Sequence, residues 1–552
     1  MIGLAGFVVA MLLTMVLMPF VKQLGYRFQM VDIPNGRKVH STPIPRIGGI
    51  AIVIGAAVPL VIWLDLTTAL KGYLAGAAVI LVFGILDDRY ELGYKLKFGA
   101  QFLAAVLAVV YGGVHFQQLH IHGHYLAFPE PMAIAITCFF ILAAVNAINF
   151  SDGLDGLAGG VVLLSLSALI VLAIRVGAND IVLICAVLIG SLLGFLLFNS
   201  HPAQIFMGDS GSQFLGFSLA VLTVHLIQDR TELFSTFLPL GLIGLPLADV
   251  FLVIVARLMQ GKSPFKPDKN HIHHRLMAVG MTQYGSVFVI YVLQGLIILA
   301  VMVQRYAGDG FYVIFFPFVV LSITGLMLFI ERYDCLPPVR YVNAFIRFPA
   351  AVFKRFKRLI NQFDLARWSR LVSVSLIIGY LLLGSLVAKP VSVEVGVIAA
   401  ALFVMLMIFQ PVDITEKVSG WFTRFIYYLS VSGILFLVYT SPGFIEYFKP
   451  YMDVLFVLLA LLIIIGIEYS NDTRLSARPI DFLVVVTAFI LSGLGGQTFD
   501  GQLYWIVAVH LLVIFYGVEL ALVFYRDTRT LNFIQIMFSL PLAVLMLRGV
   551  FF

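Results

Sequence analysis

Long runs of hydrophobic residues recur along the chain, and shorter polar stretches separate them. Each run has roughly the 17 to 25 residues with which an α-helix crosses about 30 Å of hydrocarbon, and none alternates as a barrel strand does. The pattern therefore predicts an all-α, polytopic integral membrane protein. About eleven core transmembrane helices are expected, near residues 2–20, 46–64, 71–86, 96–112, 131–149, 156–176, 180–198, 211–228, 235–257, 284–304 and 311–331. About seven C-terminal transmembrane helices are expected near 371–388, 392–410, 422–440, 451–468, 481–495, 502–524 and 532–548.

The composition excludes an ordinary soluble protein. Hydrophobic residues make up 61% of the 552 residues and charged residues only 12%, whereas soluble domains are about 45–50% apolar. Cys138, Cys185 and Cys335 lie singly in or beside hydrophobic runs, so their spacing indicates neither a disulfide framework nor a zinc site. The first run lacks a basic start and a small-residue cleavage site, so we interpret it as a retained helix rather than a signal peptide.

The distribution of Lys and Arg predicts the orientation in the membrane. If the N-terminus lies outside, the loops after the odd-numbered helices are cytoplasmic, and they hold most of the basic residues. Residues 332–370 mix Lys and Arg with hydrophobic residues, which favours a basic amphipathic cytoplasmic linker held by anionic headgroups over a specific regulatory site. The predicted organisation is a membrane core at 1–331, this linker at 332–370, and a C-terminal transmembrane region of unknown role at 371–552.

The polar loops with unusual residues all fall on the predicted cytoplasmic face, so they can meet in one site. They contribute five carboxylates, namely Asp87, Asp88, Asp152, Asp155 and Asp209. Ionisable groups at a bilayer edge are costly unless they are solvated, paired or bound to a cation, so they indicate a functional site. Oxygen ligands suit Mg²⁺, which binds through one or two carboxylates plus substrate phosphates, and nearby Lys, Arg and His would orient phosphate oxygens. The set predicts a phosphoryl-transfer site.

The aspartate motifs also have structural interpretations. Asp87 and Asp88 follow a hydrophobic run and could be a solvated helix end. The Asp-Gly-Leu-Asp-Gly repeat could be a turn with an N-cap, and Asp152 and Asp155 would share a face if a helix begins there.

The histidine-rich loop and one buried aspartate leave alternatives open. His271, His273 and His274 could form a zinc site, but no neighbouring Cys or carboxylate set completes a tetrahedron, so phosphate contact is favoured. Asp249 could be a structural partner of Arg257 or a member of the site. A transporter is a further alternative, although transporters usually place such charges near the bilayer midplane rather than in loops on one face.

Four motifs in order resemble one enzyme family. They are Asp87-Asp88; Asn146-x-x-Asn149-Phe-x-Asp152-Gly-x-Asp155-Gly-Leu; Asn199 with Phe206-Met-Gly-Asp209-Ser-Gly-Ser; and His271-x-His273-His274-Arg275. The set closely resembles the polyprenyl-phosphate N-acetylhexosamine-1-phosphate transferases of glycosyltransferase family 4, over about residues 1–331. The His-x-His-His form looks more like the N-acetylglucosamine branch than the muramoyl-pentapeptide branch, which typically has three consecutive histidines. No resemblance covers 371–552.

The resemblance implies a reaction and a set of roles. A UDP-N-acetylhexosamine, most simply UDP-GlcNAc, would react with undecaprenyl phosphate to give undecaprenyl-diphospho-sugar and UMP with Mg²⁺, or Mn²⁺ as the alternative ion. Asp209 would be the principal metal ligand, and Asp87 and Asp88 would handle the metal and the lipid phosphate, one of them as a base. The catalytic set would be completed by Asp152, Asp155, His271, His273 and His274. Substrate would be bound by Lys38, His40, Lys95, Asn149, Asn199, Phe206, which would stack on uracil, and Arg275.

The resemblance also sets the biological context. It implies a multi-pass protein of the bacterial inner membrane that starts a cell-surface glycan with its active site on the cytoplasmic face. The partners would be the two substrates and the lipid bilayer, with no nucleic acid, and a homodimer is left open. A phospho-N-acetylmuramoyl-pentapeptide transferase is the alternative within the family.

Overall fold

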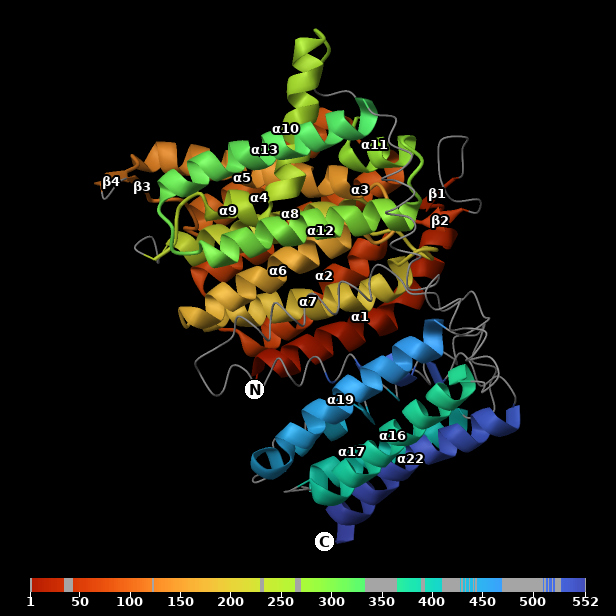
Figure 1. Cartoon of the computed structure of the whole chain (residues 1–552). Coiled ribbons are helices and arrows are strands. Elements are labelled where there is room, and N and C mark those ends of the chain that lie inside the picture. The colour runs from red at the N-terminus through yellow and green to blue at the C-terminus, as the bar shows by residue number, and fades with distance from the viewer. Residues whose placement is uncertain are drawn as a thin grey trace. The chain divides into compact units, whose positions relative to one another are not determined.

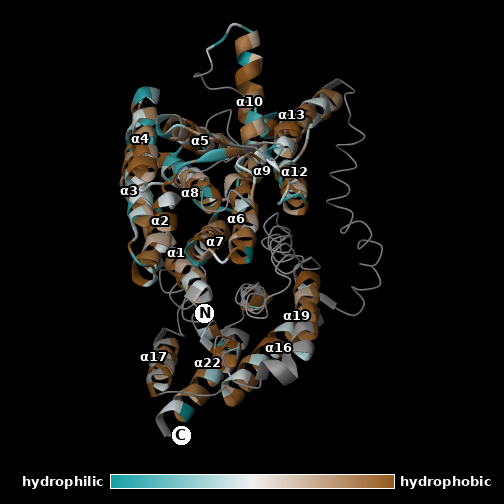
Figure 2. Ribbon diagram, turned by 90° about the vertical axis from the view of Figure 1, so that its left-hand side faces the viewer, coloured by the Kyte–Doolittle hydropathy of each residue, from teal (hydrophilic) through white to brown (hydrophobic). Residues whose placement is uncertain are grey.

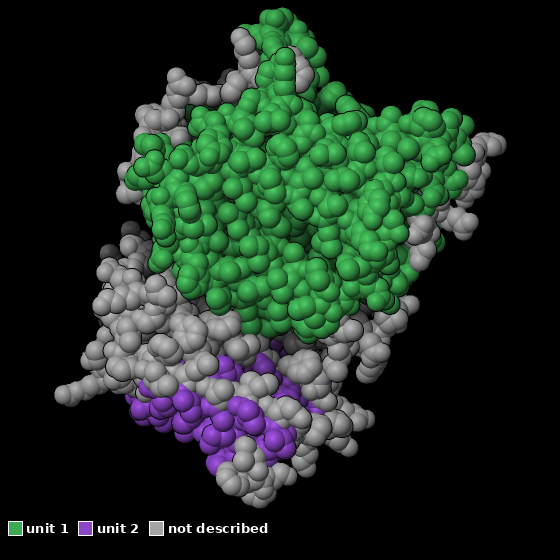
Figure 3. Space-filling model, turned by 180° about the vertical axis from the view of Figure 1, so that it is seen from behind, with its two compact units in different colours: residues 1–346, 479–495 green, residues 347–478, 496–552 purple. Residues whose placement is uncertain are grey.

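The computed structural model describes residues 2–33, 43–121, 124–228, 233–263, 270–332, 365–388, 393–409, 444–468 and 528–551, with individual positions within 427–441 and 510–521. These residues form two compact units, which Figure 3 distinguishes by colour. The described residues up to Arg332 belong to the first unit, and those from Leu365 belong to the second. In the described part of the chain, ten helices are long and apolar enough to cross a membrane. The prediction of a mainly helical, multi-pass membrane protein is therefore confirmed.

The first unit is a bundle of long helices. Its elements are α1 (Ile2–Arg27), α2 (Gly48–Trp63), α3 (Thr68–Tyr90), α4 (Tyr94–Val106) with the π-helical turn η1 (Leu107–Tyr111), α5 (Glu130–Ser151), α6 (Leu157–Arg175), α7 (Asn179–Asn199), α8 (Gly208–Gln228), α9 (Leu238–Leu242), α10 (Gly244–Met259), α11 (Ile272–Ala278), α12 (Gln283–Val303) and α13 (Asp309–Arg332). The long helices run side by side, whereas α10 runs across them (Figure 1). Hydrophobic residues dominate most of these helices (Figure 2).

Helices α6, α7 and α8 form the interior of this unit, and nearly all of their residues are buried. Helix α8 packs against α2, α3, α5 and α6, so it is central to the bundle. Buried polar contacts join neighbouring helices: Thr14 Oγ1 donates to Ser191 Oγ at 3.0 Å, and Ser191 Oγ donates to the Ile52 carbonyl at 2.7 Å. Such small hydroxyl residues let membrane helices approach closely while their polar atoms stay satisfied.

Two short antiparallel strand pairs lie at opposite ends of the bundle (Figure 1). Strand β1 (Val31–Asp32) pairs with β2 (Ile44–Pro45), and β3 (Gln118–Ile121) pairs with β4 (His124–Ala127). The hydrophobic pattern did not predict them, because strands of two to four residues are too short to show a period. At the first pair, Phe206 N donates to the Pro45 carbonyl and Gly48 N donates to the Phe206 carbonyl, both at 2.8 Å. These bonds fasten the segment before α8 to the start of α2.

The expected helix at 235–257 is wrong in one respect, because the structure divides it into α9 and α10. The break at Ile243 is stabilised by Gln294 of α12, whose Nε2 donates to the Leu242 carbonyl at 2.8 Å and whose Oε1 accepts from Leu245 N at 3.1 Å. A buried amide thus satisfies the backbone groups that the break frees. The break redirects the chain so that α10 crosses the other helices.

The second unit contains α16 (Leu365–Val387), α17 (Val393–Phe409), α19 (Phe444–Glu468) and α22 (Thr528–Phe551). They correspond to the runs expected near 371–388, 392–410, 451–468 and 532–548. Helix α16 packs against α19 and α22, and α17 packs against α22. The run at 481–495 and most of the predicted linker lie outside the described residues.

Candidate active site

The ends of three helices bring the predicted carboxylates together. Asp87 and Asp88 lie in the last turn of α3, Asp209 lies in the first turn of α8, and Asn149 lies in the last turn of α5. Asp87 and Asp88 are only 5% and 4% exposed. The expectation that the aspartates lie in loops is therefore wrong for Asp87, Asp88 and Asp209, because the helices extend beyond the hydrophobic runs.

Lys97 of α4 connects Asp87 with Asp209. Its Nζ lies 2.5 Å from Asp87 Oδ2 and 3.0 Å from Asp209 Oδ2. The second Asp87 oxygen accepts from Leu92 N at 2.7 Å. One ammonium group therefore neutralises part of the repulsion between two carboxylates that belong to different helices.

Asp88 has a different environment, since its carboxylate caps the N-terminus of α8. Oδ1 accepts from Asp209 N at 2.9 Å, and Oδ2 accepts from Ser210 N at 3.2 Å and from Ser210 Oγ at 3.0 Å. An anion at a helix N-terminus is favoured by the unpaired N–H groups and by the helix dipole. Gly208 makes the approach feasible: its φ is +70°, and a Cβ there would lie 2.6 Å from Asp88 Oδ2. The cap holds Asp209 in place.

A line of amides leads from Asp209 into the bundle. Asn149 Nδ2 donates to Asp209 Oδ1 at 3.0 Å and to Ser212 Oγ at 2.8 Å. Gln213 Nε2 donates to Asp209 Oδ2 at 3.3 Å, and Gln101 Nε2 donates to Gln213 Oε1 at 3.1 Å. The predicted substrate residue Asn149 is thus a direct neighbour of the predicted principal metal ligand.

The turn between α5 and α6 carries Asp152 and Asp155. The helix begins only at Leu157, so the two aspartates lie in the turn and the condition for sharing a helical face is not met. Burial, with the negative charges of Asp209 and Asp155 adding to it, raises the pKa of Asp152 to about 7. The turn is clamped by the amide of Asn199, whose Oδ1 accepts from Gly156 N at 3.0 Å and whose Nδ2 donates to the Ile205 carbonyl at 2.9 Å.

Asp155 forms a close pair with His201. His201 Nδ1 lies 2.6 Å from Asp155 Oδ2, and the same oxygen accepts from Ala203 N at 3.1 Å. Tyr284 packs edge-on against the His201 ring with centroids 4.9 Å apart, and its hydroxyl donates to the His201 carbonyl. Asp155 therefore orients an imidazole that is one third exposed.

The histidine motif is helical rather than a loop, because His271 precedes α11 and the other two histidines lie in its first turn. His271 pairs with Asp249, as described below. The backbone of Gly153 lies against His273, where a Cβ would be 2.2 Å from His273 Nε2. Burial, with His274 and His271 adding to it, lowers the pKa of His273 to about 3, so that this ring is neutral at pH 7. His274 is exposed beside it, with ring centroids 4.2 Å apart.

The other predicted binding residues have varied positions. Lys95 is exposed, and Phe206 and Arg275 are partly buried. Lys38 and His40 lie outside the described residues. The carboxylate of Asp249 accepts from His271 and Ile272, which joins it to the histidine motif.

Four residues of this region were not predicted as site residues: Lys97, Gln101, Gln213 and His201. The helical period could have indicated Lys97 and Gln101. Lys97 lies four residues before Gln101, so both lie on the face of α4 that buries Ala100, Gln101 and Ala104. Lys95 is out of phase with that face. His201 gave no comparable signal, because its partner Asp155 is distant in sequence.

The donor set is compatible with Mg²⁺. In the described part of the chain, no three His, Cys, Asp or Glu side chains are grouped so that they could hold a metal ion by themselves. Mg²⁺ does not require such a cage, since it binds through one or two carboxylates plus substrate phosphates and water. Asp209 and Asp87, which already share the charge of Lys97, supply that kind of ligand. Asp88 is less suited, because three hydrogen bonds from α8 occupy its oxygens.

Comparison with known proteins identifies the family to which the chain belongs. The profile of glycosyl transferase family 4 matches residues 70–227, which include α5 and nearly all of α3 and α8. A Bacillus subtilis (strain 168) protein named as a probable undecaprenyl-phosphate N-acetylglucosaminyl 1-phosphate transferase is 37% identical over 335 residues, which cover 58% of this chain and 92% of that relative. The Escherichia coli (strain K12) undecaprenyl-phosphate alpha-N-acetylglucosaminyl 1-phosphate transferase is 30% identical, over 64% of this chain and 94% of the relative.

A third relative has a different lipid in its name. The decaprenyl-phosphate N-acetylglucosaminephosphotransferase of Mycobacterium leprae is 35% identical over 50% of this chain and 76% of the relative. The matches therefore cover most of each relative but only 50% to 64% of this chain. The chain belongs to glycosyl transferase family 4, among the polyprenyl-phosphate N-acetylglucosamine-1-phosphate transferases.

Proposed function

We propose that this protein transfers N-acetylglucosamine-1-phosphate from UDP-N-acetylglucosamine to undecaprenyl phosphate, giving undecaprenyl-diphospho-N-acetylglucosamine and UMP. The observation that carries the proposal is the pair of carboxylates on α3 and α8, which are bridged by Lys97, with Asn149 of α5 bound to the same Asp209. The proposed sugar donor follows from the relatives, whose names specify N-acetylglucosamine. The proposed site faces the cytoplasm of a bacterial inner membrane, as the distribution of Lys and Arg indicates.

The reaction exchanges one phosphoanhydride bond for another. An oxygen of the lipid phosphate forms a bond to the sugar-linked phosphorus, and the bond from that phosphorus to the bridging oxygen breaks. The electron pair of the broken bond leaves with UMP. Because phosphoryl transfer needs little covalent chemistry from the protein, positioning and charge stabilisation account for most of the catalysis.

The described residues divide this work. Mg²⁺, when bound at Asp209 with Asp87, would supply the positive charge that neutralises the diphosphate. Lys97 provides a second cation between the same carboxylates. Asp88 holds the α8 terminus, and Asn149 fixes the orientation of Asp209. His274, exposed at the start of α11, would contact phosphate or sugar oxygens.

The turn between α5 and α6 would form the nucleotide wall. Asp152 lies there with a raised pKa, and Asn199 clamps the turn from α7. The role of Phe206 as a uracil platform follows from the resemblance. The residues beyond 370 are proposed to be dispensable for the transfer itself, because 58% and 64% of this chain match 92% and 94% of the two relatives.

The test is an assay of the purified full-length protein with undecaprenyl phosphate and Mg²⁺. UDP-N-acetylglucosamine, UDP-N-acetylgalactosamine and UDP-N-acetylmuramoyl-pentapeptide are supplied separately, and UMP release and the lipid product are measured. We expect turnover with UDP-N-acetylglucosamine and its loss in Asp209→Asn. Turnover only with the muramoyl donor would establish the alternative within the family, and full activity of Asp209→Asn would refute the metal assignment.

A matched control uses an aspartate at the other end of the same unit. Asp180, in the first turn of α7, lies 3.3 Å from His225 Nε2 of α8, away from the carboxylate cluster. Asp180→Asn removes the same charge and is expected to retain the transfer.

A further inference from the structure

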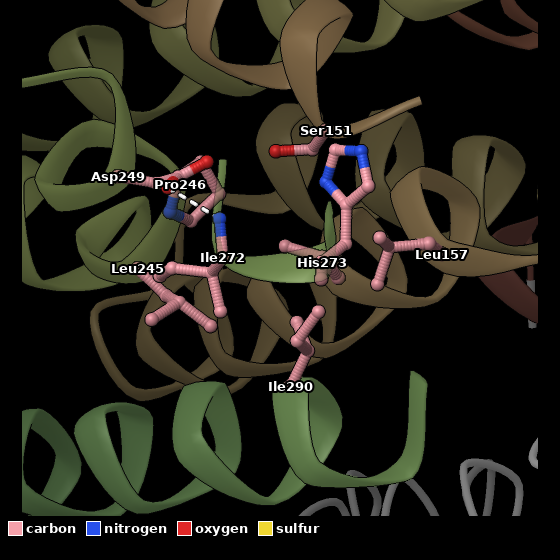
Figure 4. A pocket seen from close by; sticks show the side chains of 9 residues that line it. Ser151, Leu157, Leu245, Pro246, Asp249, Ile272, His273 and Ile290 are labelled. Carbon is pink, nitrogen blue, oxygen red and sulfur yellow. Dashed lines mark hydrogen bonds between the residues drawn. The ribbon is translucent and has the colours of Figure 1, made fainter. Parts of the chain in front are cut away.

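Asp249 is a buried carboxylate that none of the four sequence motifs contains. It lies in α10, its side chain is 9% exposed, and it has two hydrogen-bond donors on a neighbouring segment. Oδ2 lies 2.9 Å from His271 Nδ1, and Oδ1 accepts from Ile272 N at 2.9 Å. Figure 4 shows Asp249 beside Ile272, with His273 on the same small pocket. A carboxylate of one helix thus holds both the first residue of α11 and the residue before it.

The location of Asp249 is fixed by the break between α9 and α10. Gln294 binds the backbone on both sides of that break, and α10 begins immediately after it. Asp249 therefore lies near the anchored start of α10 rather than toward its far end. A charged group on a rigid element can orient its partner more tightly than a group on a loop.

The hydrogen bond from Ile272 N makes Asp249 the N-terminal cap of α11. His271 is the residue before the helix, with φ −62° and ψ 148°, and its own side chain accepts no capping hydrogen bond. Asp249 supplies the missing acceptor from another helix. The helix carries His273, His274 and Arg275, so its placement affects the whole motif.

The hydrogen bond between His271 Nδ1 and Asp249 determines which ring nitrogen of His271 carries the proton. A carboxylate accepts, so Nδ1 carries the hydrogen and Nε2 is left for another partner. The ring is also held on its faces, by Phe150 at a centroid distance of 5.4 Å and by the parallel ring of His273 at 5.9 Å. The side chain of His271 is 10% exposed, and no described residue is hydrogen-bonded to Nε2. Both the tautomer and the ring plane are thereby set before substrate arrives.

We propose that Asp249 is a positioning residue of the transferase, which orients His271 so that the lone pair of Nε2 accepts a hydrogen bond from a hydroxyl or N–H group of the sugar nucleotide. The proposal rests on the proposed function. It assigns a task to Asp249 that differs from simple capping, because capping needs only an acceptor for Ile272 N, whereas orientation of His271 needs an acceptor for Nδ1–H as well.

Asp249→Asn separates these two tasks. The amide oxygen can still accept from Ile272 N, but the amide nitrogen then faces His271 Nδ1 and favours the opposite tautomer, with Nε2–H. We expect kcat to fall by at least about 10-fold, as in other sites where the partner of a functional histidine is changed. The melting temperature should change little. Asp180→Asn, which changes another Asp–His pair of the same unit, should leave kcat unchanged.

A double-mutant cycle shows whether Asp249 acts through His271. If it does, Asp249→Asn combined with His271→Ala is no slower than His271→Ala alone. The same cycle with Asp249→Ser provides a second, smaller side chain. Losses that multiply in either cycle, or a kcat of Asp249→Asn equal to that of the unaltered protein, would overturn the proposal.

A readout that does not depend on activity keeps this test apart from the proposed function. Nitrogen-15 NMR of histidine-labelled full-length protein, with His271 assigned by its loss in His271→Ala, should show Nδ1–H in the unaltered protein and Nε2–H in Asp249→Asn. Absence of UMP release from every donor, together with the expected tautomers, would refute the proposed function but not the orientation of His271. An Nε2–H tautomer in the unaltered protein would refute the inference alone.

Discussion

Replacing Gly208 with alanine should damage the active site more than its position in the chain suggests. Gly208 is the first residue of α8 and has φ +70°, a left-handed conformation that costs a residue with a side chain roughly 1–2 kcal/mol. A Cβ there would also lie 2.0 Å from the Arg46 carbonyl oxygen and within 2.7 Å of both Asp88 carboxylate oxygens. Backbone strain and collision therefore act together.

The distances from a Cβ at position 208 to its neighbours give the displacement that the collision would cause. Real Cβ contacts essentially never fall below 3.0 Å, so the α8 terminus must retreat by about 1 Å from the Arg46 carbonyl oxygen, 2.0 Å away, and by about 0.4 Å from Asp88 Oδ2, 2.6 Å away. That movement disrupts the three hydrogen bonds by which Asp88 holds Asp209 N and Ser210, and bonds to charged groups contribute about 1.5–3 kcal/mol each. A misplacement of about 1 Å costs about 100-fold in rate. Gly208→Ala should lower kcat by about that factor.

The chain offers a matched control for the strain alone. Gly177, in the turn between α6 and α7, has φ +69°, and a Cβ there would meet nothing within 4 Å. Gly177→Ala should therefore lose roughly 1–2 kcal/mol of stability and keep its kcat. The assay is UMP release at saturating substrates together with thermal unfolding of the full-length protein. Equal kcat values for the two variants would refute the argument that the Asp88 cap positions Asp209.

Three further predictions concern charge, pH and the C-terminal region. Lys97→Gln removes the cation between Asp87 and Asp209, which also stabilises the charge that develops during transfer. The transfer rate at saturating Mg²⁺ should therefore fall by about 10-fold or more. A rate that stays unchanged over a Mg²⁺ titration would contradict this role of Lys97. The pKa of Asp152 is raised to about 7, so its contribution to stability is present at low pH and is lost as the pH rises from about 4 through 7. Without divalent ions, the melting temperature should therefore decline less over that pH range in Asp152→Asn than in the unaltered protein. Identical pH profiles of the melting temperature would refute this prediction. A chain ending at Arg370 should insert and retain transfer, and inactivity despite stable insertion would show that the C-terminal region belongs to the catalytic unit.

The helical, membrane-spanning character of the protein could be predicted because soluble folds rarely contain hydrophobic runs of membrane length. The meeting of Asp87, Asn149 and Asp209 at one end of the bundle followed from helix topology, since these residues end or begin helices that alternate in direction. The first unit confirms that the three helices bring these residues together.

The local roles within the site could not be predicted, because they depend on partners that are distant in sequence. Asp88 and Asp87 are adjacent, yet Asp88 caps α8 while Asp87 binds Lys97. Successive residues on a helix point about 100° apart, so adjacent aspartates have different neighbours. The pairs Asp155–His201 and Asp249–His271 likewise join segments whose proximity only the folded chain determines.

The same contacts explain how so many charges persist at the ends of hydrophobic helices. Three buried carboxylates have donors from a different helix: Asp87 from α4, Asp88 from α8, and Asp249 from the start of α11. Removing one donor leaves a carboxylate unsatisfied in a region where that is costly, so the helix ends must keep their relative positions. The interactions that make the cluster tolerable in the membrane are therefore also the interactions that position it for transfer. Variants that retain the shape of an acceptor but replace one of its oxygens with an N–H donor, such as Asp249→Asn, should for this reason reduce turnover before they reduce stability.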